Sequence, residues 1–132
     1  MKLSFLQTSL SLLLLLVGIQ PVVAGEITLT PSQQANNLPL GGEGGTQSTQ
    51  IIKVGTIALS SNAANGFTLT IISSNITKPD GVSPIPFQVT TVAINETPSA
   101  GSFTTEAGQN YTYLNSTANA SETRDVYIKY SP

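Results

Sequence analysis

The sequence contains no cysteine, no histidine and no tryptophan. Without histidine or cysteine, the chain cannot build a Ser-His-Asp or Cys-His catalytic site, or a zinc site with imidazole or thiolate ligands. It also forms no disulfides, although many small secreted domains depend on them. Any folded domain must therefore be held together by packing and hydrogen bonds alone.

Charged residues are scarce as well, with 5 lysines and arginines against 7 aspartates and glutamates. Binding to nucleic acid requires a basic patch that neutralises phosphates, so this weakly acidic composition excludes nucleic acid as an expected partner. It also speaks against electrostatic docking on an anionic membrane. Disorder does not follow from the low charge, because the chain is rich in the β-branched residues that disordered chains lack.

Residues 1–24 have the three parts of a cleavable secretory signal peptide. Lys2 supplies a positive charge, an apolar run extends from Leu10 to Ile19, and Ala24 is the small residue before the expected cut. The alternative, a membrane anchor, needs about 20 apolar residues, whereas this run is shorter and is followed by a glutamine and a proline. We therefore expect a mature chain that begins at Gly25, is secreted, periplasmic or on the cell surface, and has no further membrane contact.

Two regions of different composition follow the signal peptide. Residues 25–50 combine a short alternating strand, GEITLT, with a flexible linker that contains GGEGG at positions 41–45. No strand-to-helix context surrounds these glycines, so phosphate binding is not expected. Residues 51–132 are long enough for one small domain.

Several short segments of this domain are dense in β-branched residues or alternate apolar and polar residues with a period of two. Strands are expected at residues 51–59, 67–72, 85–94, 102–105, 111–114 and 124–130. Asn65-Gly66 indicates a tight turn, and Gly55 indicates a bulge inside the first of these strands. About seven short strands predict an all-β fold: an antiparallel two-sheet sandwich of immunoglobulin-like type, with a small barrel as the alternative.

The carboxylates of the mature chain stand mostly alone in the sequence. Glu122 and Asp125 form the nearest pair, and a solvated charge cluster at a strand start explains them as well as a catalytic pair does. Asp80 would join them as a calcium ligand only if loops brought the three together, and the spacing matches no calcium loop. We therefore expect no catalytic residue, no metal site and no cofactor.

The segment Asn110 to Ser121 (NYTYLNSTANAS) is the candidate binding loop. Tyr111 and Tyr113, together with Asn110 and Asn115, offer rings and amides that can stack on and hydrogen-bond a sugar or a protein. The alternative is that the two tyrosines, which share one face of a strand, fill the core. The sequence also has five Asn-x-Ser/Thr sites, which are glycan acceptors only in a pathway that glycosylates them: Asn75, Asn95, Asn110, Asn115 and Asn119.

The sequence ends at Pro132, directly after a strongly alternating strand. A sandwich that lacked a strand would expose an edge to another chain, and a truncated sequence is a further explanation. The segment Glu26 to Thr30 is the candidate donor strand, with Ile27 and Leu29 on its apolar face. It either pairs with a second copy or another exported β protein, or folds back onto its own domain.

The layout as a whole resembles small exported bacterial surface proteins, especially fimbrial subunits. The shared features are the signal peptide, the GEITLT segment, the Gly-rich linker and a β domain rich in threonine and serine. FTLTIISSN and RDVYIKYSP are also similar to strands of uncharacterised secreted β-sandwich proteins of cyanobacteria, which implies a fold and no activity. We expect an exported, non-catalytic protein with a structural or adhesive role. The alternatives are a secreted glycan- or protein-binding module and, third, a small hydrolase that uses carboxylates.

Overall fold

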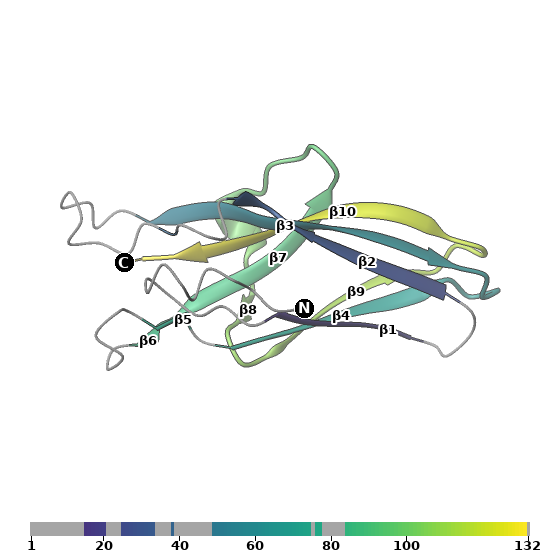
Figure 1. Cartoon of the computed structure of the whole chain (residues 1–132), viewed down its shortest axis with the longest axis horizontal. Helices are drawn as coiled ribbons and strands as arrows, with labels where there is room; N and C mark the ends of the chain where they lie inside the picture. The colour runs from purple at the N-terminus through teal and green to yellow at the C-terminus, as the bar shows by residue number, and fades with distance from the viewer. Residues whose placement is uncertain are drawn as a thin grey trace.

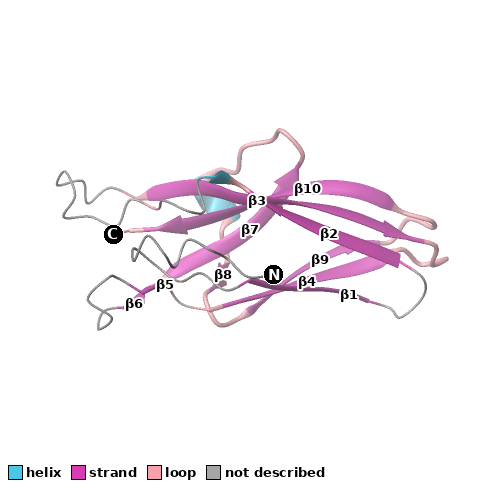
Figure 2. Cartoon of the chain, in the orientation of Figure 1, coloured by secondary structure: helices cyan, strands magenta, loops and turns pink. Residues whose placement is uncertain are grey.

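The computed structural model describes residues 15–20, 25–33, 38, 49–74, 76–77 and 84–131. These residues form β-strands joined by turns and loops, with a 3₁₀ turn at Ala100–Ser102 (Figure 2). Over the same described ranges, no helix is long and apolar enough to cross a membrane. The expected turn at Lys78 to Gly81 and the acid Asp80 lie outside the described residues.

Two antiparallel sheets face each other as two layers (Figure 1). The three-stranded sheet has the order β1-β4-β9, and the five-stranded sheet has the order β2-β3-β10-β7-β8. The strands are β1 (Leu15–Gln20), β2 (Gly25–Pro31), β3 (Gln50–Ser61), β4 (Phe67–Ser73), β7 (Phe87–Ala93), β8 (Thr105–Glu106), β9 (Asn110–Asn115) and β10 (Ser121–Tyr130). The short strands β5 (Ile76–Thr77) and β6 (Pro84–Ile85) pair separately. The predicted all-β sandwich is therefore confirmed in place of the barrel, and its immunoglobulin-like type stays a prediction.

The core lies between the two sheets, and the period-two pattern of the sequence places it there. In β4, the side chains of Phe67, Leu69 and Ile71 are buried, whereas the residues between them are not. β10 repeats the pattern on the facing sheet, where Val126 and Ile128 have no exposed surface. Because a strand alternates its side chains between two faces, each sheet turns one apolar face towards the other.

The bulge predicted at Gly55 is present where β3 pairs with the central strand β10. Val126 pairs with Gly55, but the next residue, Tyr127, pairs with Lys53, so Val54 is the extra residue of β3. A Cβ atom on Gly55 would lie 3.0 Å from the backbone oxygen of Thr30 in β2. Glycine therefore allows the neighbouring strand to approach closely at this point.

Two of the expected strands have different boundaries in the structure. The strand expected at 85–94 is divided at Pro86, which has no amide hydrogen to donate, so that β6 ends before it and β7 begins after it. The strand expected at 102–105 begins three residues later, at Thr105. Ser102 closes the 3₁₀ turn by donating its N–H to the carbonyl of Ser99 at 3.0 Å, and β8 begins only at Thr105.

The N-terminal segments occupy neighbouring positions at one side of the sandwich. β1, which lies inside the predicted signal peptide, pairs with β4, and β2 pairs with β3 of its own chain from Gly25 to Pro31. The structure thus places the candidate donor strand in the folded-back arrangement. Most of the Gly-rich linker lies outside the described residues, but Leu38 is buried in the core.

Candidate functional site

Six polar and aromatic side chains meet between the two sheets and form what we call the inter-sheet polar cluster. β9 of the three-stranded sheet supplies Tyr111, Tyr113 and Asn115, whereas β7 and β10 of the five-stranded sheet supply Thr91, Glu122 and Arg124. These side chains join positions that are up to 33 residues apart in the sequence. The cluster is the largest group of interacting polar side chains among the described residues.

Arg124 is the centre of the inter-sheet polar cluster, and it uses its guanidinium in three directions. It donates from Nε to the hydroxyl of Thr91 at 2.8 Å and from a terminal nitrogen to the Thr91 carbonyl at 3.0 Å. The other terminal nitrogen forms an ion pair with Glu122 at 2.8 Å. The guanidinium carbon also lies 3.7 Å from the centre of the Tyr113 ring, which is a cation–π contact.

Glu122 accepts hydrogen bonds from three side chains. The Tyr113 hydroxyl lies 2.9 Å from both carboxylate oxygens, and the Asn115 amide donates to one of them at 2.9 Å. Burial raises the pKa of Glu122, but the hydrogen bonds from Asn115, Arg124 and Tyr113 outweigh it, so the pKa lies below its usual value. An ionised carboxylate whose oxygens already accept hydrogen bonds from three side chains is poorly suited to act as a general acid or base at neutral pH.

The two tyrosines of the candidate binding loop point inwards. Both pack against the core, the Tyr111 hydroxyl lies 2.6 Å from that of Thr91, and burial together with the Glu122 carboxylate raises the pKa of Tyr113. Asn115 is bound to Glu122, and Asn110 is exposed at the start of β9. The four residues are therefore not presented together on one loop, because β9 alternates its side chains between two faces.

Asp125 forms a second polar group on the opposite, outer face of the five-stranded sheet. Its carboxylate accepts hydrogen bonds from the Thr56 hydroxyl at 2.8 Å and the Asn95 backbone N–H at 2.9 Å, and pairs with Lys53 at 2.9 Å. Only 1% of the side chain is exposed. Burial raises the pKa of Asp125, but the bonds from Lys53, Asn95 and Thr56 outweigh it and the pKa is lowered.

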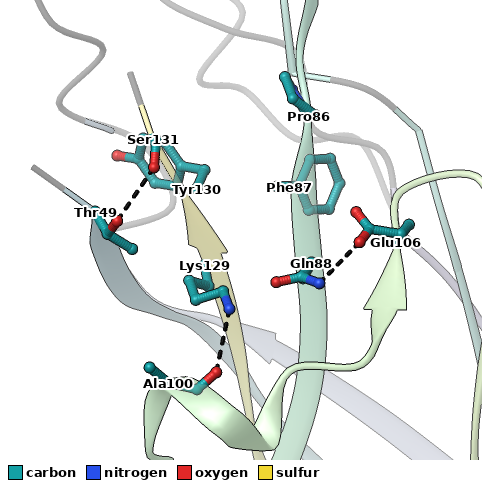
Figure 3. Close-up of a pocket in the computed structure, with 9 residues that line it drawn as sticks. All are labelled: Thr49, Pro86, Phe87, Gln88, Ala100, Glu106, Lys129, Tyr130 and Ser131. Carbon is teal, nitrogen blue, oxygen red and sulfur yellow. Dashed lines mark hydrogen bonds between the residues drawn. The ribbon is translucent and has the colours of Figure 1, made fainter. Parts of the chain in front are cut away.

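A hollow of about 510 Å³ lies near the end of β10, between this strand, β7 and β8 (Figure 3). Gln88 and Lys129, which are paired in the strand register, both line it. Gln88 donates to the exposed carboxylate of Glu106 at 2.8 Å, and Lys129 donates to the Ala100 carbonyl at 3.1 Å. The hollow therefore offers an amide, an amine and a carboxylate, and each of them already has a partner in the chain.

The described residues contain no group of three or more acidic, histidine or cysteine side chains that could hold a metal ion. Glu122 and Asp125, which stand close together in the sequence, lie on opposite faces of β10 because their positions differ by three, an odd number. These two acids therefore do not converge on one site.

Sequence reasoning did not single out Arg124, Thr91 or Lys53. The sequence does contain an indication of the role of Arg124, because this residue stands in phase with the buried residues Val126 and Ile128 of the same alternating strand. A charged residue in phase with a buried face needs a partner, since an unpaired buried charge is costly. No such signal marks Thr91, whose role depends on the pairing of β7 with β10.

No protein-family model, no curated protein and no solved structure matches this chain.

Proposed function

We propose that the chain is an exported, non-catalytic β-sandwich protein with a structural or adhesive role at the cell surface or in the periplasm, similar to a fimbrial subunit. The signal-peptide pattern of residues 1–24 supports export. The observation that carries the structural role is the placement of Glu122 and Asp125, which lie on opposite faces of β10 and are each engaged by structural partners. Catalytic carboxylates must converge on one substrate, so this placement favours a scaffold over a hydrolase.

The outward faces of the strands support an interaction role. Thr28 and Thr30 of β2, Thr70 of β4 and Thr112 of β9 are exposed or half-buried, and none of these faces carries a dense cluster of charge. Hydroxyl groups can donate and accept hydrogen bonds in direct contact with a protein or a glycan, and salt does not screen these bonds as it screens interactions between surface charges. Such a surface suits a protein that is packed beside others.

Export is tested by expressing the full sequence in a bacterial host and measuring the intact mass of the product in each cell fraction. The expected product lies outside the cytoplasm and begins at Gly25. An Ala24→Tyr variant should keep the mass of the precursor, because the residue before the cut must be small, whereas the matched Ala24→Ser variant should be processed. A cytoplasmic product that retains Met1 would contradict the proposal.

Strand addition to a second copy, or to another exported β protein, is the form of assembly that we propose. In one version Ile27 and Leu29 of β2 enter a neighbouring molecule, which requires the pairing of β2 with β3 to open first. Light scattering on the mature protein tests this version. Concentration-dependent assembly that survives deletion of residues 25–50 would rule out β2 as the donor.

A second candidate function is that of a secreted glycan-binding module, and the hollow beside Gln88, Glu106 and Lys129 favours it. Its amide, carboxylate and amine are groups that hydrogen-bond sugar hydroxyls. A glycan array probed with the mature protein tests this function, with Glu106→Gln and Lys129→Met as the variants expected to lose binding. An array that is blank at high protein concentration would count strongly against a sugar ligand.

A further inference from the structure

The pairing of β1 with β4 covers an edge that the mature protein would leave open. In the full chain, β4 lies between β1 and β9, and the register joins Leu15 to Ser73 and Gln20 to Thr68. All of β1 lies within residues 1–24, which the proposed function assigns to the signal peptide. Cleavage after Ala24 would therefore remove the partner of β4 along residues 68–73.

The edge exposed in this way is unusually suited to pairing with another strand. β4 has the sequence FTLTIIS, with no charged residue, no proline and no glycine, which are the devices that commonly protect sheet edges. Its core-facing residues Leu69 and Ile71 have 0% and 1% of their surface exposed while β1 is in place. Removal of β1 would leave backbone donors and acceptors unpaired beside this apolar row.

We propose that β4 of the mature protein pairs with β4 of a second copy, antiparallel and across a two-fold axis at Thr70. This inference rests on the proposed function, because it requires the signal peptide to be removed. A symmetric dimer needs a self-complementary surface, and an antiparallel strand pair provides one. The two three-stranded sheets would then continue into each other through the paired β4 strands.

The position of the axis follows from the alternation of β4. With Thr70 opposite its own copy, Leu69 pairs with Ile71 and Phe67 with Ser73, so all residues of β4 are paired and each buried residue meets another buried residue. A register shifted by one residue would bring the buried row of one copy opposite the outward row of the other. Opposed threonines on the outer face add a favourable cross-strand pair.

A second copy of β4 is a better occupant than β2 of a neighbouring molecule. β2 is already paired with β3 from Gly25 to Pro31. Its transfer to the β4 edge of a neighbouring molecule would leave the edge of β3 unpaired. Pairing of β4 with β4 opens no existing pair. The absence of charge on β4 also removes the repulsion that two identical charged edges would meet.

The test uses protein that has been exported and processed from the full sequence. Intact mass first establishes that the chain begins at Gly25, and light scattering then measures its molecular mass over a hundredfold range of concentration. The variants are Thr70→Lys and Thr70→Glu, each of which places like charges opposite each other at the axis. The matched control is Thr112→Lys, because Thr112 pairs with Thr70 from the neighbouring strand β9 and is also not buried.

We expect the wild type and the Thr112→Lys variant to approach twice the mass of one chain as the concentration rises. Each Thr70 variant alone should dimerise at least about fivefold more weakly, since like charges opposite each other in a sheet are repulsive. An equimolar mixture of the Lys and Glu variants should regain the dimer, which also shows that both variants are folded.

Three outcomes would overturn the inference, and they are distinguishable. A product that retains residues 15–20 contradicts both the proposed function and the dimer. A product that begins at Gly25 but stays monomeric leaves the proposed export intact and refutes the dimer. A third outcome is an assembly that forms equally well in the wild type and in the Thr70 variants, or a mixture of the two variants that dimerises no better than either variant alone. Either result would place the contact on a different surface, such as β2.

Discussion

Gly66 shows how a single residue sets the turn between β3 and β4. It has a φ of 75°, which favours glycine, and it donates its N–H to the Ala63 carbonyl at 3.3 Å. A Cβ atom at this position would lie 1.8 Å from the backbone oxygen of Asn115, in the strand that pairs with β4. The glycine therefore serves both the turn that the Asn65-Gly66 pair predicts and a close approach that the sequence does not reveal.

Gly66→Ala should therefore destabilise the protein more than the backbone conformation alone explains. Gly108 is the matched control, because its φ is 84° but a Cβ atom there would meet nothing within 4 Å. We expect Gly108→Ala to lower the free energy of unfolding by about 1 kcal/mol and Gly66→Ala to lower it by about 3 kcal/mol. Urea denaturation measures both, and equal losses would contradict a steric role for Gly66.

The ionisation of Asp125 should make stability depend on pH. Its pKa in the folded protein is lowered by Lys53, Asn95 and Thr56 despite its burial, so the ionised form binds these partners more strongly than the protonated form does. The stabilisation is present above the pKa of an unfolded aspartate, about 3.9, and is lost as pH falls through the lower folded pKa.

Asp125→Asn should be less stable than the wild type at pH 7, and the difference should shrink as the pH falls from about 5 to about 2. Free energies of unfolding from urea titrations at several pH values would measure this. Lys53→Met should have the same sign of pH dependence, because it removes the cation that pairs with the same carboxylate. A difference that stays constant with pH would mean that the charge of Asp125 is not what stabilises the fold.

At the scale of elements, the two faces of β10 contact different parts of the molecule. Its inward face carries Arg124, which lies against the Tyr113 ring of β9. Its outward face carries Lys129, which donates to the Ala100 carbonyl and lies 5.5 Å from the Phe103 ring. Tyr127 also reaches outwards to the Glu96 carbonyl at 3.3 Å. The strand thus joins the opposite sheet on one side and the loop that follows β7 on the other.

Arg124→Met and Lys129→Met compare these two faces with the same replacement. We expect Arg124→Met to cost about 3 kcal/mol, because it leaves Glu122 and the Thr91 carbonyl without their cationic partner inside the sandwich. Lys129→Met should cost less than about 1 kcal/mol, because its hydrogen bond is exposed. Urea denaturation of both variants tests the comparison, and similar losses would show that the inter-sheet polar cluster adds no particular stability.

The sequence predicts elements whose signal is local and misses those that depend on distant partners. Alternation correctly locates β4 and β10, because a half-buried strand must alternate whatever its neighbour is. The density of β-branched residues correctly locates β3. β1 was not predicted, because its run LLVGIQ has no alternation and only pairing with β4 makes it a strand.

The residues of the inter-sheet polar cluster show the same difference between local signals and distant partners. Tyr111 and Tyr113 share a face, as expected, and that face is the inward one. The sequence left this choice open, because an exposed strand and a half-buried strand can both carry tyrosine. The partners that decide it are Thr91 and Glu122, and they are brought to β9 by the stacking of two sheets. Tertiary packing of this kind is not encoded in the spacing of residues along one strand.

At the scale of the whole molecule, the two sheets are tied together differently at their two sides. β9 approaches β7 at one side, where the inter-sheet polar cluster links the sheets by hydrogen bonds and an ion pair. β1 approaches β2 at the other side. Removal of β1 would therefore take away the strand that approaches β2 at this side, and a chain without cysteine has no disulfide to hold the two sheets together there.

A chain that retains β1 should consequently be monomeric and more stable than the mature protein. The comparison is between residues 15–132 and residues 25–132, with the free energy of unfolding and the light-scattering mass measured for both. In the longer chain β1 keeps the edge of β4 paired, so we expect a larger free energy of unfolding, a larger denaturant dependence because more surface is buried, and no dimer.

The control for this comparison is the longer chain with Val17→Pro and Gly18→Pro together. Successive residues of a strand direct their N–H groups to opposite sides, so one of these two prolines must remove a donor that faces β4. This variant should lose the pairing and return to the stability and the dimer of the mature protein. If it remains monomeric and as stable as its parent, β1 does not act through its pairing with β4, and the open edge is not what drives association.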